Sequence, residues 1–143
     1  MSQDRLVELI KKQIRIEKNF VKTVDEQIKS LHTVAAKLLM LETQKDSEKH
    51  AMVLDGILTV IKQKGTKPLW NTLLDSYVDK IVAKRNLEKH IKTEAAMLEN
   101  IKEAMKETKD EGIKLLLEHI GNDEKKHHEI MHEVLKQAYK IKP

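Results

Sequence analysis

Apolar residues recur at intervals of three and four positions along almost the whole chain. This spacing places them on one face of an α-helix, whereas a half-buried strand would need strict alternation. The chain holds 4 glycines and 2 prolines, too few for the many turns of an all-β fold. We therefore predict an all-α fold. Its four long helices are expected over residues 4–31, 34–64, 79–107 and 111–140.

The breaks between these helices differ in length. The pair His32-Thr33 and the stretch 108–110 are short turns, and Asp110 is a candidate N-cap. The middle break opens with Gly65 and Pro68, and it is barely long enough to cross a bundle. Short turns join antiparallel neighbours, and a long connection permits a crossover. The predicted organisation is one domain, 1–143, with a hairpin over 4–64, a connector over 65–79 and a second hairpin over 80–140.

A constant offset of 77 positions relates the two predicted hairpins. Over residues 10–59 an ungapped comparison at this offset gives 12 identities in 50 positions. The informative identities are polar and join Glu17 with Glu94, Asp46 with Asp123, and His50 with His127. Both turns also come into register, which predicts a duplicated helical hairpin.

Several polar residues continue the apolar stripes instead of the solvent faces. A carboxylate in an apolar core costs free energy unless it is paired or bound to a metal. Glu124 and His127 are three residues apart, so their side chains point the same way from a helix. Each hairpin also separates its first Glu from its His by 33 residues, which places the two at a similar height. The predicted metal ligands are Glu17, His50, Glu94, Glu124 and His127.

This arrangement resembles the ferritin-like superfamily of di-iron carboxylate proteins, and within it the rubrerythrin-like and bacterioferritin-like branch. The resemblance covers the whole chain and rests on Glu17, His50, Glu94 and the run Asp123-Glu124-Lys125-Lys126-His127. It implies a ferritin-like four-helix bundle with a long crossover. It also implies that Glu124 bridges two metals and that the other ligands are terminal. Asp46 and Asp123 would each hydrogen-bond the ligand histidine of the opposite motif.

One position departs from that family's pattern. Ser47 stands where the second bridging glutamate is expected, and Glu48 is rotated from that direction by about 100°. Three carboxylates then face two divalent ions. Either an added ligand such as hydroxide completes a dinuclear site, or only one ion binds well. His90, four residues before Glu94, is either an extra ligand or a hydrogen-bonded core residue.

The resemblance implies an iron cofactor, most simply a di-iron site that reacts with peroxide or dioxygen in a rubrerythrin-like oxidative-stress role. The activity would be that of a peroxidase, an oxidase or a ferroxidase. Carboxylate and imidazole ligands suit manganese and zinc as well. The chain has no cysteine, so an electron donor would be a separate protein. Two alternatives stay open: glutamate–histidine pairs that hydrogen-bond without metal, and a non-enzymatic helical scaffold with a degenerate single-metal site.

The amino-acid composition limits which kinds of molecule this protein is expected to bind. The net charge of +4 comes from 27 basic and 23 acidic residues interleaved along the chain, and only 3% of residues are aromatic. Nucleic-acid binding is not expected, since the chain has no arginine-rich segment and almost no aromatic residues to stack on bases. The N-terminal sequence is charged at once, and no apolar run is long enough for a membrane span. A soluble cytoplasmic protein is therefore expected.

A homodimer is the predicted assembly. The connector holds Trp70 and Tyr77, and aromatic residues favour interfaces. If one helix continued from Pro68 to Glu107, it would span roughly 60 Å and could not fold back within one chain. The dimer would then be domain-swapped, with a metal site shared between subunits. An unswapped dimer through the connector is the alternative.

Overall fold

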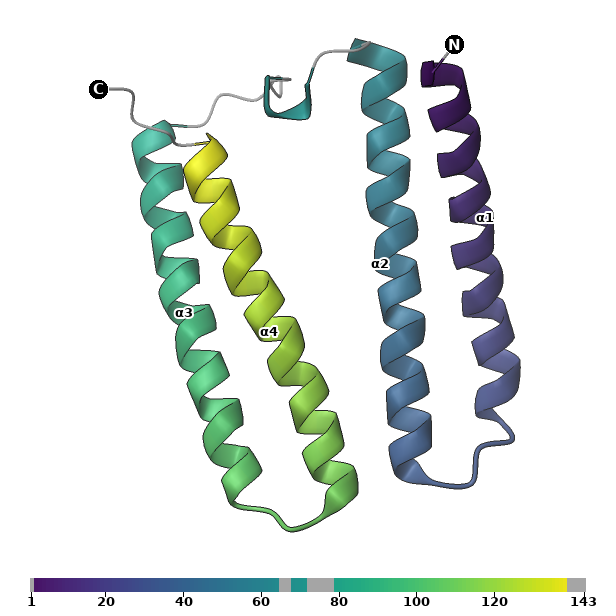
Figure 1. Ribbon diagram of the computed structural model, residues 1–143, viewed down its shortest axis with the longest axis vertical. Coiled ribbons are helices and arrows are strands. Elements are labelled where there is room, and N and C mark those ends of the chain that lie inside the picture. The colour runs from purple at the N-terminus through teal and green to yellow at the C-terminus, as the bar shows by residue number, and fades with distance from the viewer. Residues whose placement is uncertain (1, 65–67, 72–78, 139–143) are drawn as a thin grey trace. The chain divides into compact units, whose positions relative to one another are not determined.

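A computed structural model describes residues 2–64, 68–71 and 79–138. These ranges contain four α-helices and one short 3-10 helix, with no strand (Figure 1). The all-α prediction is therefore confirmed. The elements are α1 (Ser2–Ile28), α2 (Val34–Lys64), η1 (Leu69–Asn71), α3 (Lys80–Lys106) and α4 (Glu111–Ala138).

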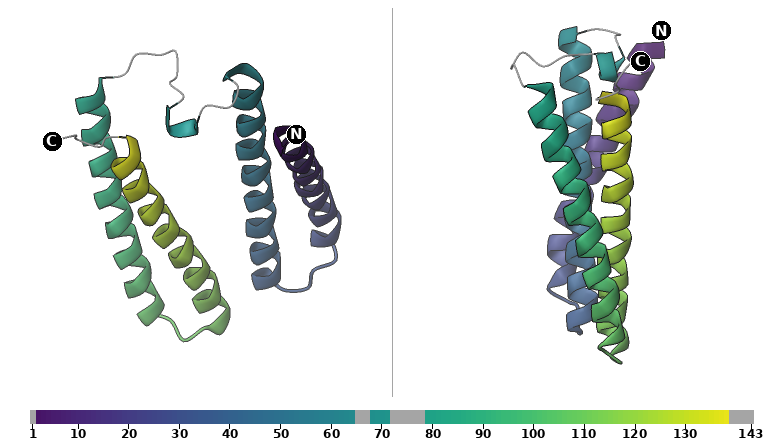
Figure 2. Two further views of the ribbon diagram at one scale, coloured as in Figure 1. Left: turned by 45° about the horizontal axis from the view of Figure 1, so that its top comes forward. Right: turned by 90° about the vertical axis from the view of Figure 1, so that its left-hand side faces the viewer.

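The helices form two antiparallel hairpins, each of which is a compact unit. Helices α1 and α2 lie side by side in one hairpin, and α3 and α4 do so in the other (Figures 1 and 2). We call them hairpin one and hairpin two. Short turns force neighbouring helices to run antiparallel, as the sequence predicted. The packing of the two hairpins into one bundle stays a prediction.

The predicted helix ends are close to the observed ones. The bounds of α2 agree fully, and those of α3 differ by one residue at each end. Helix α1 ends three residues earlier than predicted, at Ile28. The reason is a tight turn, in which the Ser30 N–H donates to the Gln27 carbonyl (3.0 Å) and the Leu31 N–H to the Ile28 carbonyl (3.3 Å). The predicted residues 139–140 of the last helix lie outside the described part of the chain.

Side-chain caps fix the starts of three helices. The Asp110 carboxylate accepts a hydrogen bond from the Ile113 N–H (3.0 Å), which confirms the predicted cap of α4. The Thr33 hydroxyl accepts from the Ala36 N–H (3.1 Å) at the start of α2. Asp79 caps α3 in the same way. These caps set the first residues of α2, α3 and α4, the helices that carry four of the five predicted metal ligands.

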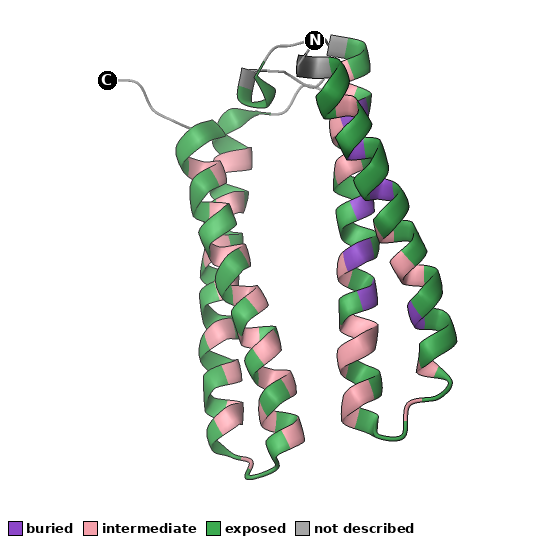
Figure 3. Cartoon of the chain, turned by 45° about the vertical axis from the view of Figure 1, so that its right-hand side comes forward, coloured by how far each residue is buried: buried purple, intermediate pink, exposed green. Residues whose placement is uncertain are grey.

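Hairpin one has a small apolar core. Ile10, Ile14 and Leu58 are buried and pack together, and Val24 has no exposed surface at all. Two polar residues, Gln44 and Ser47, are also buried in this hairpin. Gln44 donates to the Val21 carbonyl (2.9 Å) and to Asp25 Oδ1 (2.7 Å). Every buried residue in Figure 3 belongs to this hairpin.

Hairpin two is more open along its whole length. No described residue of α3 or α4 is buried, and its facing apolar side chains are half-buried. One close approach stands out at Gly121. A Cβ atom on this glycine would lie 3.3 Å from the Ile101 side chain, so the absent side chain brings the two helices together here.

The connector is described only in part. The 3-10 helix η1 lies in it, and Leu69 and Trp70 each keep 54% of their surface exposed. Tyr77, which the sequence places with Trp70 at an expected interface, lies outside the described residues. None of the described helices has a stretch apolar and long enough to traverse a lipid bilayer.

Candidate metal centre

Hairpin two brings two carboxylates and one imidazole together midway along its length. Helix α3 supplies Glu94, and α4 supplies Glu124 and His127. His127 Nδ1 lies 3.8 Å from Glu94 Oε1 and 3.9 Å from Glu124 Oε2. Both carboxylates are covered, with 12% of each side chain exposed, whereas the imidazole is 41% exposed. The structure thus assembles three of the five predicted ligands within one hairpin.

The two carboxylates of this cluster have unmet hydrogen-bonding capacity. Among the described residues, Glu94 Oε2 and Glu124 Oε2 have no hydrogen-bond partner, although both atoms are buried. Carboxylate oxygens only accept, so two of them need a proton or a cation between them. The largest cause of the raised pKa of Glu124 is a hydrogen bond with Glu94, which a carboxyl group can donate only when it is protonated. Burial is the next cause, and His127 opposes the rise.

The cluster has the donor set and nearly the dimensions of a cation site. The ligand atoms of Glu94, Glu124 and His127 all lie within 4.8 Å of one another. Ligand atoms about 2.1 Å from one ion lie no more than about 4.2 Å apart, so small side-chain movements close the site. Two carboxylates and one neutral imidazole fit Fe(II), Mn(II) or Zn(II).

Hairpin one places its own glutamate and histidine in contact. His50 Nδ1 lies 3.4 Å from Glu17 Oε1, and Glu17 keeps only 13% of its side chain exposed. The same oxygen accepts a hydrogen bond from Gln13 Nε2 (3.1 Å). Ser47 is buried beside it, with 7% of its surface exposed. Position 47 therefore faces the glutamate of its hairpin, as the predicted register of α2 requires.

Ser47 changes the electrostatics of this pair. The hydrogen bond from its hydroxyl is the largest cause of a pKa for Glu17 below the usual range. Burial opposes the shift, while the Gln13 amide and the His50 ring contribute to it. The Ser47 hydroxyl, the Gln13 amide and the His50 ring thus favour the carboxylate form of Glu17 without a metal ion.

The exposure of His50 differs from the expectation. The sequence placed it on the apolar stripe of α2, but 55% of its side chain is exposed. The ring nevertheless lies within 3.4 Å of the Glu17 carboxylate. His90, the proposed extra ligand, is also exposed on α3.

The two aspartates precede the ligand positions as expected, within their own hairpins. Asp46 Oδ1 lies 3.2 Å from Lys49 Nζ. Asp123 lies next to Glu124, and its charge adds to the rise in the pKa of that residue. Their predicted hydrogen bonds to the histidines of the opposite motifs stay predictions.

Two further features lie outside the predicted set of metal ligands. Gln13 contacts Glu17, and its position four residues earlier on the same helix is the signal that would have found it. His128 and His132 lie one turn apart on α4 with their Nε2 atoms 3.1 Å from each other. One ring must donate and the other accept, so at most one of these two nitrogens carries the shared proton.

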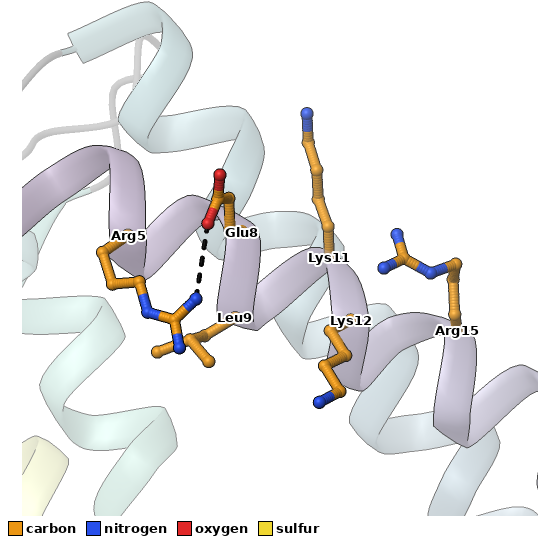
Figure 4. Close-up of a pocket in the computed structure, with 6 residues that line it drawn as sticks. All are labelled: Arg5, Glu8, Leu9, Lys11, Lys12 and Arg15. Carbon is orange, nitrogen blue, oxygen red and sulfur yellow. Dashed lines mark hydrogen bonds and ion pairs between the residues drawn. The ribbon is translucent and has the colours of Figure 1, made fainter.

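A shallow hollow on α1 is separate from these clusters. Figure 4 shows long charged side chains around it, with one ion pair between Arg5 and Glu8 (3.4 Å). Both of these side chains are 70% exposed. Its lining residues are Arg5, Glu8, Leu9, Lys11, Lys12 and Arg15. Such a solvated basic face contributes little binding energy by itself.

Comparison of the chain with models of protein families, with curated proteins and with solved structures gives no match in any of the three. The case for a metal centre therefore rests on the residues themselves and on the geometry of the two hairpins.

Proposed function

We propose that this protein is a ferritin-like metalloprotein that binds a redox-active divalent cation, iron or manganese, through Glu94, Glu124 and His127. The observation that carries the proposal is the pair of covered carboxylate oxygens in hairpin two, which have no hydrogen-bond partner in the described structure. Buried charges are normally paired or bound to a metal. A cation placed between these two glutamates would satisfy both.

A shared proton is the competing way to satisfy the same oxygens. It would neutralise one carboxylate but leave the other to interact with His127 alone. Three features favour the cation: an imidazole nitrogen lies within 4 Å of both carboxylates, all three ligand atoms converge, and His127 is open on one side. Solvent access at His127 provides a route by which an ion enters.

The proposed architecture is the four-helix bundle of the ferritin-like class, built from the two hairpins. When bound, iron would supply electron transfer toward peroxide or dioxygen. The protein's own contribution is to hold two carboxylates in a covered position and to orient one imidazole toward them. The reducing electrons would come from a centre outside these 143 residues, which contain no cysteine for a thiolate-bound cluster.

A non-enzymatic helical scaffold is the second candidate function. The observation that favours it is the hydrogen bond from Ser47 to Glu17, by which hairpin one satisfies its glutamate internally. A chain that kept only part of a metal layer would then use its metal, or its polar pairs, to stabilise the fold.

Metal titration of the chelator-treated, untagged protein tests the proposal. Calorimetry with Mn(II) or anaerobic Fe(II) should show saturable binding. Glu94→Gln should weaken it at least about tenfold because it removes a charged ligand. Glu99→Gln is the matched control, since this glutamate is on the same helix with 70% of its side chain exposed and pairs with Lys102. Absence of binding, or equal affinity in Glu94→Gln and wild type, would contradict the proposal.

A further inference from the structure

We infer that cation binding is confined to hairpin two, so that each chain takes up one ion, and that Ser47 is the residue that keeps hairpin one free of metal. This inference rests on the proposed function and refines it. The ferritin-like family pattern has two bridging carboxylates between two ions, whereas this chain has a hydroxyl at one of the two positions.

The two hairpins can be compared residue by residue through the offset of 77. The offset pairs Val34 with Glu111, the first residues of α2 and α4, so both hairpins share one register. Within that register the equivalent positions are Glu17 and Glu94, Ser47 and Glu124, His50 and His127, and Gln13 and His90. Two of the four are identical, and the other two change the chemistry.

In hairpin one the changes supply donors to the glutamate. Gln13 donates to Glu17 Oε1, the Ser47 hydroxyl donates to the same carboxylate, and His50 lies 3.4 Å away. A cation would have to displace these hydrogen bonds. It would gain one carboxylate, one imidazole and a neutral hydroxyl, which is a poor ligand for a divalent ion unless it loses its proton.

In hairpin two the equivalent positions lack the hydrogen-bond donors of hairpin one, and one of them carries an added negative charge. Glu124 stands where Ser47 stands in hairpin one, so a second carboxylate replaces a donor. One oxygen of each glutamate is left covered and without a hydrogen-bond partner among the described residues. His90, in the place of Gln13, is exposed on α3. A cation here would replace a proton shared by the two carboxyl groups, and it is attracted by two charges instead of one.

The stoichiometry of Mn(II) binding tests this inference by exchanging the two equivalent residues. Wild type should bind one ion per chain. Ser47→Glu should raise the number to two, because it gives hairpin one the same carboxylate pair as hairpin two. Glu124→Ser should bind none. Thr59→Glu, an exposed position on the same helix, is the control for added charge and should leave the number at one.

A second pair of variants covers the case in which a buried glutamate at position 47 prevents folding. His50→Ala should leave the affinity for Mn(II) within about twofold of wild type, whereas His127→Ala should lower it at least about tenfold. Circular dichroism confirms the helical fold of every variant.

The outcomes separate this inference from the function on which it rests. Two ions per wild-type chain, or equal losses of affinity in His50→Ala and His127→Ala, would overturn the confinement to hairpin two and leave the metalloprotein intact. A folded Ser47→Glu protein that still binds one ion would remove Ser47 from its assigned role. No binding by wild type would overturn both.

Discussion

The two hairpins of this chain each carry a glutamate and a histidine at the same spacing, but they surround the glutamate with different groups. In hairpin one, Glu17 receives hydrogen bonds from Ser47 and Gln13, and its pKa is lowered. In hairpin two, Glu124 faces Glu94, and its pKa is raised. One position, serine in the first hairpin and glutamate in the second, accounts for most of this difference.

The comparison shows that a repeated ligand pattern does not imply a repeated site. A glutamate and a histidine 33 residues apart meet in both hairpins. Whether they need a cation depends on the third group beside them. A donor makes the pair complete, whereas a second acceptor leaves two covered charges that a proton or a metal ion must neutralise.

The largest expected difference between the hairpins lies in their apolar packing. Ile14 and Ile91 are equivalent and identical, yet Ile14 is 7% exposed and Ile91 is half-buried. Ile14→Ala should lower the free energy of unfolding by about 3 kcal/mol, because it opens a cavity in a closed core. Ile91→Ala should cost about half as much. Urea unfolding of the metal-free protein measures both, and equal costs would contradict the difference in packing.

The two glutamates should respond in opposite directions to loss of their charge. Glu17→Gln should destabilise the metal-free protein by about 2 kcal/mol, because hydrogen bonds to a charged group are among the stronger ones. Glu124→Gln should stabilise it by about 1 kcal/mol, because an amide can donate to Glu94 and the repulsion is removed. The comparison uses urea unfolding near neutral pH with a chelator present. Destabilisation by both substitutions would show that the hairpins are electrostatically alike.

The pH dependence of stability should also have opposite signs. The lowered pKa of Glu17 gives stability that is present above the usual glutamate range and is lost as the pH falls through the folded-state value. The raised pKa of Glu124 gives stability that is present below the usual range and is lost as the pH rises through its folded-state value.

Two variants isolate these contributions. Ser47→Ala should cost about 1 kcal/mol near neutral pH, and this cost should shrink as the pH falls through the lowered folded-state pKa of Glu17. The stabilisation by Glu124→Gln should shrink at about pH 4, where the wild-type residue is already neutral in the folded state. Differences that do not vary with pH would contradict both assignments.

The smallest effects concern two of the helix glycines, Gly56 and Gly121. No atom lies within 4 Å of a Cβ placed on Gly56, so Gly56→Ala should stabilise α2 by about 0.5–1 kcal/mol through helix propensity alone. At Gly121 the same gain is offset by the contact of 3.3 Å with Ile101, so Gly121→Ala should give a smaller net gain. Thermal melts rank the two. A larger gain at Gly121 would show that the helices of hairpin two separate easily.

Much of the fold followed from the sequence because its signals are local. Helical periodicity gave four helices, and a capping aspartate at position 110 marked the start of α4. The end of α1 was predicted three residues too late, because the apolar stripe continues through Leu31 while the backbone has already turned at Ile28. Periodicity reports which side chains are apolar, not where backbone hydrogen bonds change.

The sequence was enough to predict which residues form the candidate site. It was not enough to predict which of them receive hydrogen bonds from neighbouring side chains. Spacing brought Glu94, Glu124 and His127 together, as the structure shows. Helical spacing places Gln13 one turn from Glu17, but it does not show that Gln13 and Ser47 complete the hydrogen bonding of Glu17, or that His50 is more than half exposed. These properties depend on rotamers and on partners from another helix, which a pattern along one helix does not encode.

The most direct test of the contrast between the hairpins is a carboxyl NMR titration of the full-length, metal-free protein. Resonances assigned through Glu17→Gln and Glu124→Gln report each side-chain carboxyl as the pH is varied. We expect Glu17 to titrate below the usual glutamate range and Glu124 above it. Titration of both groups in the usual range, or in the reverse order, would contradict the account.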